Sequence, residues 1–535
     1  MAQRPNLLLP GLQRWPADKP VIELRGVGKS FNGRVVLHDV NLSVPTGKTT
    51  VISGESASGK SVLLRLMNGL EVPDTGAVLL FGQDIKQISE RARTELRKRC
   101  MMVFQNYALI DSLDVAHNIA FPILQNTRMK HADAMKLVRE LLELLELPHA
   151  FDLMPASLSG GMKKRVALAR AVISGPEVVL FDEPTTGLDP IMIAFVDEMI
   201  RRTQREFEIT SVIVSHDMAS NRNLADQMAM LSGGTIVQTG SFEDIQTSHV
   251  PAVEHFMANA VTERMERAEG AETGIDLTCK DDTPAIAEVV DLHRFFGKNH
   301  VLKGISATIP ERRITVVIGG SGSGKSVLIK HIIGLLTPNK GVVKVFGEDL
   351  SRLSGRDLQA LRARIGMLFQ GAALFDSLTV RENLAFPLVE GRGKRGKEVK
   401  DAVEEVAERL KVKDVLDRMP HNISNGERKR VGLARALITK PDIMVYDEPT
   451  TGQDPIMMRR VDDMIVEASG AFEITSLVIS HDMLSTFRIA DKIIMIHKGE
   501  VAAAGTPEQL KASPDPRVQA FIYAGSQGPV EDPGG

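Results

Sequence analysis

The chain has 535 residues, of which 43% are hydrophobic and 25% charged, and its formal net charge is -3. These values are typical of a soluble globular protein with several domains, each large enough to bury a core. They exclude a polybasic nucleic-acid-binding protein, so no nucleic-acid partner is expected. Cys100 and Cys279 are the only cysteines. A disulfide scaffold is therefore also excluded, and both thiols are expected to be reduced.

No stretch of the sequence has the pattern of a membrane span. The N-terminal extension, residues 1–20, holds an apolar stretch that is too short and too interrupted by proline for a signal peptide. No uninterrupted apolar run reaches the roughly 20 residues that a transmembrane helix needs. We therefore expect any membrane role to be peripheral.

One repeat covers almost the whole chain, because matched residues in the two halves are always separated by 265 positions. The matched pairs are Phe31 and Phe296, Lys60 and Lys325, Gln105 and Gln370, Asp182 and Asp447, His216 and His481, and Phe256 and Phe521. The constant spacing predicts two copies of one fold. We place domain 1 at 21–258, a charged linker at 259–285, domain 2 at 286–523 and a tail at 524–535. The linker can stretch to roughly 90 Å at about 3.3 Å per residue, enough for the domains to face each other.

In chain order, each half reads as a strand, a glycine loop, a helix, a helical insert and a second buried strand. The β-branched run 49–53 enters the glycine loop, and helical spacing follows the loop. In the insert, apolar residues recur at helical spacing, at Val138, Leu141, Leu142 and Leu145. The segment 178–184, VVLFDEP, is typical of a buried parallel strand that ends in acids. This order predicts α/β domains, each with a helical subdomain.

The two glycine loops, GESASGKS at 54–61 and GGSGSGKS at 319–326, both satisfy the pattern G-x-x-x-x-G-K-S of P-loop NTPases. Such a loop curls its backbone amides around phosphate oxygens, its lysine reaches the β- and γ-phosphates, and its serine hydroxyl binds magnesium. The residues expected to bind ATP here are Gly54, Ser56, Gly59, Lys60 and Ser61 in the first loop, and Gly319, Ser321, Gly322, Gly324, Lys325 and Ser326 in the second. ATP and Mg²⁺ are the expected cofactors.

An acid pair ends the second buried strand of each half, and a histidine follows the next β-branched run. Because an unpaired acid pair is costly to bury, we expect a cation or substrate to balance it. We assign the aspartates, Asp182 and Asp447, to magnesium and the glutamates, Glu183 and Glu448, to polarising the attacking water. His216 and His481 lie at matched distances after the acids, which favours contact with the γ-phosphate over a purely structural role.

Together these motifs resemble the nucleotide-binding domains of ATP-binding-cassette (ABC) proteins, over nearly the entire chain. The resemblance implies further roles, as follows. Gln105 and Gln370 would link magnesium to a transport subunit, and Phe31 and Phe296 would stack on adenine. Asp189 and Asp454 would communicate across the dimer. The residues of the signature loops would be Ser159, Gly160 and Gly161 in LSGGM, and Ser424 and Gly426 in ISNGE. For Phe31 and Phe296, simple packing is an equally common alternative.

In this family, ATP lies between one domain's phosphate loop and the other domain's signature loop. Site one would then combine the first phosphate loop with the altered ISNGE loop, and site two would combine the second phosphate loop with the intact LSGGM loop. Asn425 adds a Cβ where glycine lets phosphate approach the backbone, and Glu427 adds negative charge. We therefore expect site two to hydrolyse ATP faster while site one mainly binds it. The alternative is that both sites turn over.

Three further segments resemble ATPases of the Mla/Mce lipid-transport systems. They are FQNYALIDSLDVAHNIAFPI and its second copy, the DPIM segments after the acids, and DPRVQAFIYAGSQGPV near the C-terminus. The resemblance implies integral membrane permease subunits as partners, whether identical or different, with a periplasmic lipid-binding MCE-type protein beyond them. It places the chain in the cytoplasm, at the inner face of the inner membrane. Phe121-Pro122 and Phe386-Pro387 are expected to face the permease, and the basic stretch 391–400 reads as a solvated loop or a headgroup contact.

Two other functions remain open from the sequence. An ABC ATPase for another solute, such as a sugar or peptide, shares every catalytic motif. Soluble tandem ABC proteins that act on ribosomes also carry two cassettes, although the linker here is shorter than their long charged helical hairpin. The ATPase motifs do not encode the cargo or the direction of transport.

Overall fold

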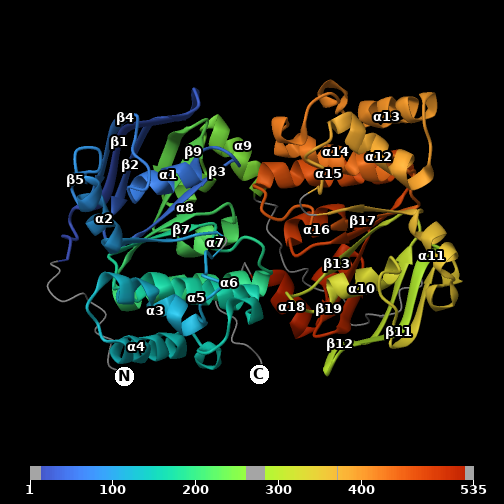
Figure 1. The fold of residues 1–535 in the computed structure, drawn as a ribbon, viewed down its shortest axis with the longest axis horizontal. Coiled ribbons are helices and arrows are strands. Elements are labelled where there is room, and N and C mark those ends of the chain that lie inside the picture. The colour runs from blue at the N-terminus through green and yellow to red at the C-terminus, as the bar shows by residue number, and fades with distance from the viewer. Residues whose placement is uncertain (1–13, 106, 261–282, 370–371, 525–535) are drawn as a thin grey trace.

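The computed structural model describes residues 14–105, 107–260, 283–369 and 372–524 (Figure 1). Within these residues, the two halves contain the same strands and α-helices in the same order, and matched elements begin 265 residues apart, or 266 for α4 and α13. The two halves lie side by side in Figure 1, the first coloured blue to green and the second yellow to red.

The first half is an α/β unit that runs from β1 to α9. Its strands are β1 (Pro20–Phe31), β2 (Arg34–Pro45), β3 (Thr49–Gly54), β4 (Thr75–Leu80), β5 (Gln83–Asp84), β6 (Cys100–Val103), β7 (Val178–Asp182), β8 (Thr210–Val214), β9 (Gln227–Ser232) and β10 (Thr235–Gly240). Its helices are α1 (Lys60–Met67), α2 (Glu90–Arg99), α3 (Val115–Asn126), α4 (His131–Leu144), α5 (Gly160–Val172), α6 (Pro190–Phe207), α7 (Met218–Leu224), α8 (Phe242–Gln246) and α9 (Pro251–Ala260), with short 3-10 turns at Pro148–Ala150 and Pro155–Ser157.

The second half repeats this unit from β11 to α18. Its strands are β11 (Ala285–Phe296), β12 (Asn299–Pro310), β13 (Ile314–Ile318), β14 (Lys340–Val345), β15 (Glu348–Asp349), β16 (Ile365–Leu368), β17 (Ile443–Asp447), β18 (Thr475–Ile479), β19 (Lys492–His497) and β20 (Glu500–Gly505). Its helices are α10 (Lys325–Ile332), α11 (Gly355–Arg362), α12 (Val380–Arg392), α13 (Lys397–Arg409), α14 (Asn425–Leu437), α15 (Pro455–Phe472), α16 (Met483–Ile489), α17 (Pro507–Lys511) and α18 (Pro516–Tyr523), with 3-10 turns at Leu350–Arg352, Lys413–Val415 and Pro420–Asn422.

A six-stranded sheet positions the chemistry of each half. In the first half its order is β10-β9-β3-β8-β7-β6, and all neighbours are parallel except β9 and β10. The second half has the same order and pairing. Because the carboxyl ends of parallel strands meet at one edge, the glycine loop after β3, the acids after β7 and the histidine after β8 come together there.

Two hydrophobic clusters cover the two faces of this sheet. Along β3 the side chains alternate, so that Val51 packs in the cluster beneath the helical subdomain and Ile52 packs in the cluster beneath the other sheet. The helical subdomain consists of α3, α4 and α5. Val138, Leu141 and Leu142 of α4 are buried in it as the helical spacing predicts. The predicted α/β fold with a helical subdomain is therefore confirmed.

A four-stranded antiparallel sheet in each half was not predicted. In the first half its order is β2-β1-β4-β5. The irregular pairing of β1 explains why the sequence pattern hid it: register shifts interrupt the strand, one of them between Leu24 and Val27. These shifts break the strict alternation of buried and exposed residues from which a strand is recognised.

The ends of the two repeats pack across the boundary between the halves. Figure 1 shows α9 of the first half against α15 of the second, and α18 of the second half against α6 of the first, in agreement with the contacts between these helices. Ile456 of α15 even belongs to a hydrophobic cluster of the first half. The two halves therefore contact each other through apolar side chains, independently of any bound nucleotide. In the described part of the chain, no helix is long and apolar enough to cross a membrane.

Candidate functional site: two facing ATP sites

Each glycine loop joins the end of the central strand to the first turn of a helix. In the first loop, Gly54 and Gly59 have φ values of 151° and 105°, and in the second, Gly319 and Gly324 have φ values of 145° and 109°. A Cβ on Gly54 would lie 2.0 Å from the Leu231 carbonyl oxygen. Glycine is therefore required both by the backbone conformation and by the close approach of the neighbouring strand.

The loop lysines are buried and lie inside their own loops. Lys60 Nζ donates to the carbonyls of Gly54 and Glu55, at 2.8 and 2.7 Å, and Lys325 Nζ donates to those of Gly319 and Gly320, at 2.7 and 3.1 Å. Burial lowers the pKa of both lysines, and nearby acids oppose this shift. A buried ammonium group that is bonded to neutral carbonyls is matched to an anionic ligand such as phosphate.

The strand-end aspartate of the first half contacts the serine of its glycine loop. Ser61 Oγ donates to Asp182 Oδ1 at 3.1 Å. Burial raises the pKa of Asp182, and burial together with the charge of Glu448 raises that of Asp447. A bound cation would reverse this cost. A serine hydroxyl and one carboxylate, completed by phosphate and water, is the oxygen donor set that magnesium prefers, so these residues fit the metal.

The glutamate that follows each aspartate is paired with the histidine. Glu183 Oε2 lies 2.7 Å from His216 Nδ1, and Glu448 Oε1 lies 3.5 Å from His481 Nδ1. Burial alone raises the pKa of Glu183, but the hydrogen bond and charge of His216 outweigh it, so its net pKa lies below the usual value. Hydroxyls of Thr186 and Thr451 also donate to these glutamates, at 2.8 and 3.2 Å.

Both glutamates have a strained backbone. Their φ values are 53° for Glu183 and 47° for Glu448, in the left-handed region that non-glycine residues rarely adopt. Backbone strain of this kind persists where the surroundings fix it, and it concentrates at functional sites. The two glutamates share this conformation at matched positions, and their catalytic role stays a prediction.

A reciprocal pair of hydrogen bonds joins the two halves at these sites. Asp189 Oδ2 accepts from the Ser321 backbone amide at 2.8 Å, and Asp454 Oδ2 accepts from the Ser56 amide at 2.8 Å. Each aspartate also caps a helix with its other oxygen, so its position is fixed on both sides. The aspartate of each half therefore holds the phosphate loop of the other.

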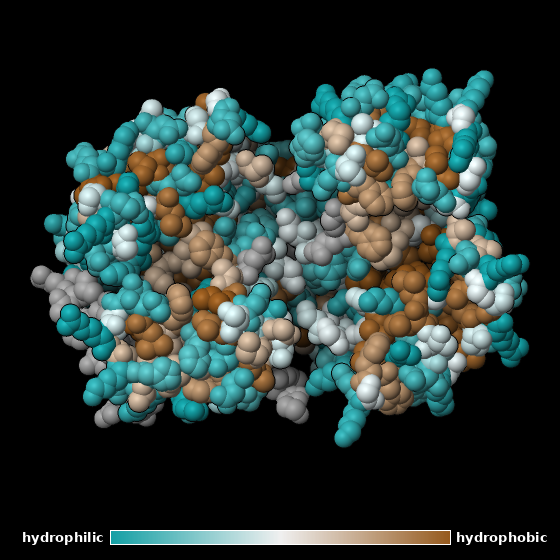
Figure 2. All heavy atoms as spheres, in the orientation of Figure 1, coloured by the Kyte–Doolittle hydropathy of each residue, from teal (hydrophilic) through white to brown (hydrophobic). Residues whose placement is uncertain are grey.

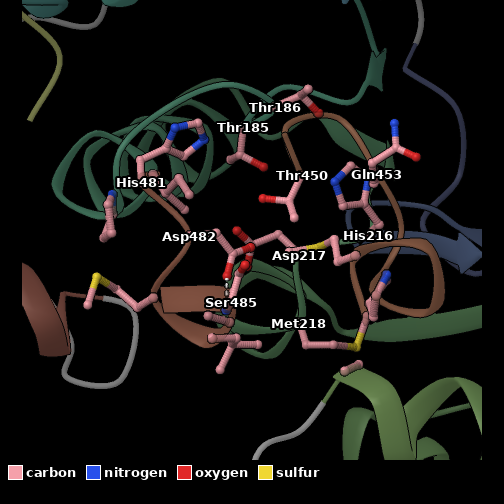
Figure 3. A pocket seen from close by; sticks show the side chains of 18 of the residues that line it. Thr185, Thr186, His216, Asp217, Met218, Thr450, Gln453, His481, Asp482 and Ser485 are labelled. Carbon is pink, nitrogen blue, oxygen red and sulfur yellow. Dashed lines mark hydrogen bonds between the residues drawn. The ribbon is translucent and has the colours of Figure 1, made fainter. Parts of the chain in front are cut away.

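Both halves line one cavity of about 380 Å³, and the chain neighbours of the two aspartates, Leu188, Pro190, Gln453 and Pro455, are among its lining residues. Figure 3 shows His216 and Asp217 of the first half, and His481 and Asp482 of the second, around this one space. Asp217 and Asp482 each cap the helix that follows the histidine. One residue of each candidate site, His216 and His481, therefore lines the same cavity.

The two signature loops differ in how their serines are bonded. Ser159 Oγ accepts from the Met162 amide at 3.3 Å. In the second half, both the amide and the hydroxyl of Ser424 donate to Glu427 Oε2, each at 2.7 Å. These bonds lower the pKa of Glu427. The hydroxyl of Ser424 is therefore already paired with a carboxylate.

The side chain of Asn425 lies outside the described residues, but the matching Gly160 is informative. A Cβ built on Gly160 would meet the Tyr107 hydroxyl at 3.9 Å, an ordinary contact. The described protein neighbours thus leave room for a side chain there. A glycine is therefore needed at this position only if a ligand comes close to the backbone.

The remaining predicted residues are the two phenylalanines expected to stack on adenine and the two glutamines expected to link magnesium to a transport subunit. Phe31 and Phe296 end β1 and β11 and are 39% and 45% exposed. Lys29 Nζ lies 5.3 Å from the centroid of the Phe31 ring and the Arg294 guanidinium lies 4.8 Å from that of the Phe296 ring, and stacking on adenine stays a prediction. Gln105 is exposed after β6, and Gln370 lies outside the described residues. The sequence analysis did not identify Lys164, a buried lysine close to Glu183. In the sequence, a buried lysine near a signature loop looks the same as a solvent-exposed one.

The comparisons with known proteins agree with this geometry. A family model described as ABC transporter matches residues 37–186 and 302–451, more than half of the chain. The chain belongs to the ABC transporter family. It is an ATP-binding and ATP-hydrolysing subunit of this family, and the two matched segments are the two cassettes.

Some relatives extend over both cassettes of this ABC subunit, and others match a stretch the length of one cassette. An uncharacterized ABC transporter ATP-binding protein of Methanocaldococcus jannaschii is 28% identical over 92% of this chain and 96% of its own length. The glutathione import ATP-binding protein GsiA of Pectobacterium atrosepticum is 28% identical over 99% of this chain and 92% of its own. The methionine import ATP-binding protein MetN of Clostridium acetobutylicum is 40% identical over 42% of this chain and 70% of its own. These relatives are not specifically lipid-transport ATPases.

The second glycine loop allows a matched test of the phosphate site. Gly319→Ala places a Cβ 2.1 Å from the Ile496 carbonyl oxygen at a φ of 145°, and Gly320→Ala places one 3.9 Å from Asp189 Oδ2. We expect Gly319→Ala to weaken ATP binding at this loop by at least about 10-fold, the equivalent of about 1.4 kcal/mol, and Gly320→Ala to have little effect. Titration with a fluorescent ATP analogue, in chains that also carry Lys60→Ala, measures both. Equal affinities for the two variants would contradict the assignment.

Proposed function

We propose that this chain supplies both ATPase domains of one membrane transporter and forms two composite, unequal ATP sites within a single polypeptide. The observation that carries the proposal is the reciprocal bonding of Asp189 to the Ser321 amide and of Asp454 to the Ser56 amide. It supports a sandwich in which each phosphate loop faces the opposite half. Site one would pair the loop of Lys60 with the signature of Ser424, and site two would pair the loop of Lys325 with Ser159.

Within each site, the chain's own groups would divide the work. The loop amides and lysine hold the phosphates, and the first acid and the loop serine would hold magnesium, which neutralises the developing phosphate charge when it is bound. Glu448 in site two would take a proton from the attacking water, with His481 beside it to orient the carboxylate and contact the γ-phosphate. Glu183 and His216 would act in the same way in site one.

The difference between the signature serines supports unequal sites. In site two, the residue that matches Glu427 is Met162. No carboxylate at that position therefore accepts the proton of the Ser159 hydroxyl. In site one, the Ser424 hydroxyl donates to Glu427, which also brings negative charge toward an anionic nucleotide. Site two is then the faster site, and site one mainly binds ATP.

A permease partner accounts for apolar side chains that remain on the surface. Phe104 and Phe121 of the first half, and Phe369, Phe375 and Phe386 of the second, are between 37% and 48% exposed. They lie in the segments around and after each glutamine, and Phe375 and Phe386 contact each other with ring centroids 4.7 Å apart. On the face drawn in Figure 2, hydrophobic residues likewise gather near the middle of the second half, within a largely hydrophilic surface. Exposed apolar clusters of this kind suit a protein partner, here at the inner face of the inner membrane.

For the cargo, we favour phospholipid or another lipid, handed to or from a periplasmic MCE-type protein. The support is the resemblance of the segments after the glutamines and of the C-terminal DPRVQAFIYAGSQGPV to Mla/Mce ATPases. A small polar solute is the second candidate. It is favoured by the relative named for glutathione import, which this chain matches over nearly its full length.

The unequal sites are tested by two matched substitutions. We expect Glu448→Gln to lower steady-state ATPase activity by at least about 100-fold, because site two loses its base, and Glu183→Gln to lower it by less than about 3-fold. Both variants keep the volume of the side chain, and nucleotide binding by each serves as the control. Equal losses would contradict the unequal-site proposal.

The transport role is tested by purification of the tagged chain from detergent-solubilised membranes. We expect an integral membrane subunit to co-purify, and extracted phospholipid to exceed that in a mock purification. Recovery of ribosomes without any integral membrane subunit would contradict the transport role. Recovery of a permease without enriched lipid would favour the small-solute candidate.

A further inference from the structure

One buried lysine in each half touches the segment that links the two ATP sites. Lys164 lies in α5, just after the signature loop, and only 6% of it is exposed. Its Nζ donates to the carbonyls of Pro184 and Thr186, the latter at 3.1 Å. Lys429 in α14 is 9% exposed and donates to the Pro449 carbonyl. Each lysine therefore ties the signature helix to the loop that follows the catalytic glutamate.

The loop held by Lys164 has a catalytic group at one end and an interdomain contact at the other. Glu183 precedes Pro184 and accepts a hydrogen bond from Thr186 at 2.8 Å. Asp189, a few residues later, accepts from the Ser321 amide of the opposite phosphate loop at 2.8 Å. A displacement of Lys164 would thus move a segment that belongs to both sites.

Stability alone does not favour a lysine at this position. The bonds that Lys164 makes are to neutral carbonyls, and burial lowers its pKa to about 8, with the charge of Glu183 opposing the shift. Burial lowers the pKa of Lys429 to about 8 as well. Burying a cation against neutral acceptors costs free energy that an apolar side chain of similar length would not. A role in the ATPase cycle explains why both halves keep the charge.

We propose that Lys164 and Lys429 are positioning residues that couple the two ATP sites. The proposal rests on the composite sites described above. Through α5, Lys164 responds to the signature loop at site two, and through Pro184 and Thr186 it sets the place of Glu183 at site one. Lys429 makes the same connection in the opposite direction, from the signature at site one to Glu448 at site two.

A double-mutant cycle in the full chain tests this coupling. Lys60→Ala removes the phosphate lysine of site one, and ATPase activity then reports on site two. With Lys164 present, we expect Lys60→Ala to lower the kcat/KM of site two by at least about 5-fold, a typical size for coupling between sites. With Lys164→Met, the same change should lower it by less than about 2-fold, close to no coupling. Lys164→Arg, which keeps the charge and the donors, should restore most of the effect, and the exposed Lys136→Met serves as the matched control.

Each outcome decides the proposal. An equal effect of Lys60→Ala with and without Lys164 overturns the coupling role and leaves the composite sites intact. No effect of Lys60→Ala even in the chain with Lys164 shows that the two sites do not influence each other, which also overturns the coupling role and leaves the composite sites to the Glu448→Gln and Glu183→Gln comparison. If Lys164→Met fails to fold, Lys429→Met combined with Lys325→Ala gives the same cycle, read from the affinity of site one for a fluorescent ATP analogue. An unchanged coupling in that cycle overturns the proposal.

Discussion

The arrangement of the whole molecule depends on two equivalent hydrogen bonds, in which Asp189 and Asp454 each accept from a backbone amide of the opposite glycine loop. A charged acceptor at a loop that must bind phosphate is useful only if its position is exact, because a carboxylate that drifted into the phosphate site would repel the ligand. The helix caps made by the same aspartates supply that precision. The packing of α9 against α15 and of α18 against α6 also fixes the position of one half relative to the other.

Carrying both cassettes in one polypeptide lets the two sites differ. In a homodimer every substitution appears twice, so a change in a signature loop alters both sites. Here ISNGE occurs once, and the Ser424 hydroxyl bonds to Glu427 while Ser159 has Met162 at the matched position. The same fusion also sets both halves at a fixed ratio and a high effective concentration, so that pairing does not depend on the amount of protein.

Much of this structure follows from the sequence. The 265-residue spacing, the glycine loops and the acids after buried strands predict the tandem α/β fold, because each motif has one place at the carboxyl edge of a parallel sheet. The bulged β1 escapes prediction, because its register shifts break the alternation of buried and exposed residues. The role of Lys164 also escapes, because only the folded chain brings it to the Pro184 and Thr186 carbonyls, about 20 residues away. Cargo identity is not written in either cassette, because the groups that handle ATP do not contact the transported molecule.

The central claim is that one chain holds two unequal ATP sites and that site two turns over. The most direct measurement is vanadate trapping with a photoreactive ATP analogue, followed by peptide mapping of the intact chain. Because trapping requires hydrolysis, the account predicts that the label lies mainly on peptides of the second half around Lys325. Equal labelling around Lys60 and Lys325, or labelling mainly around Lys60, would contradict it.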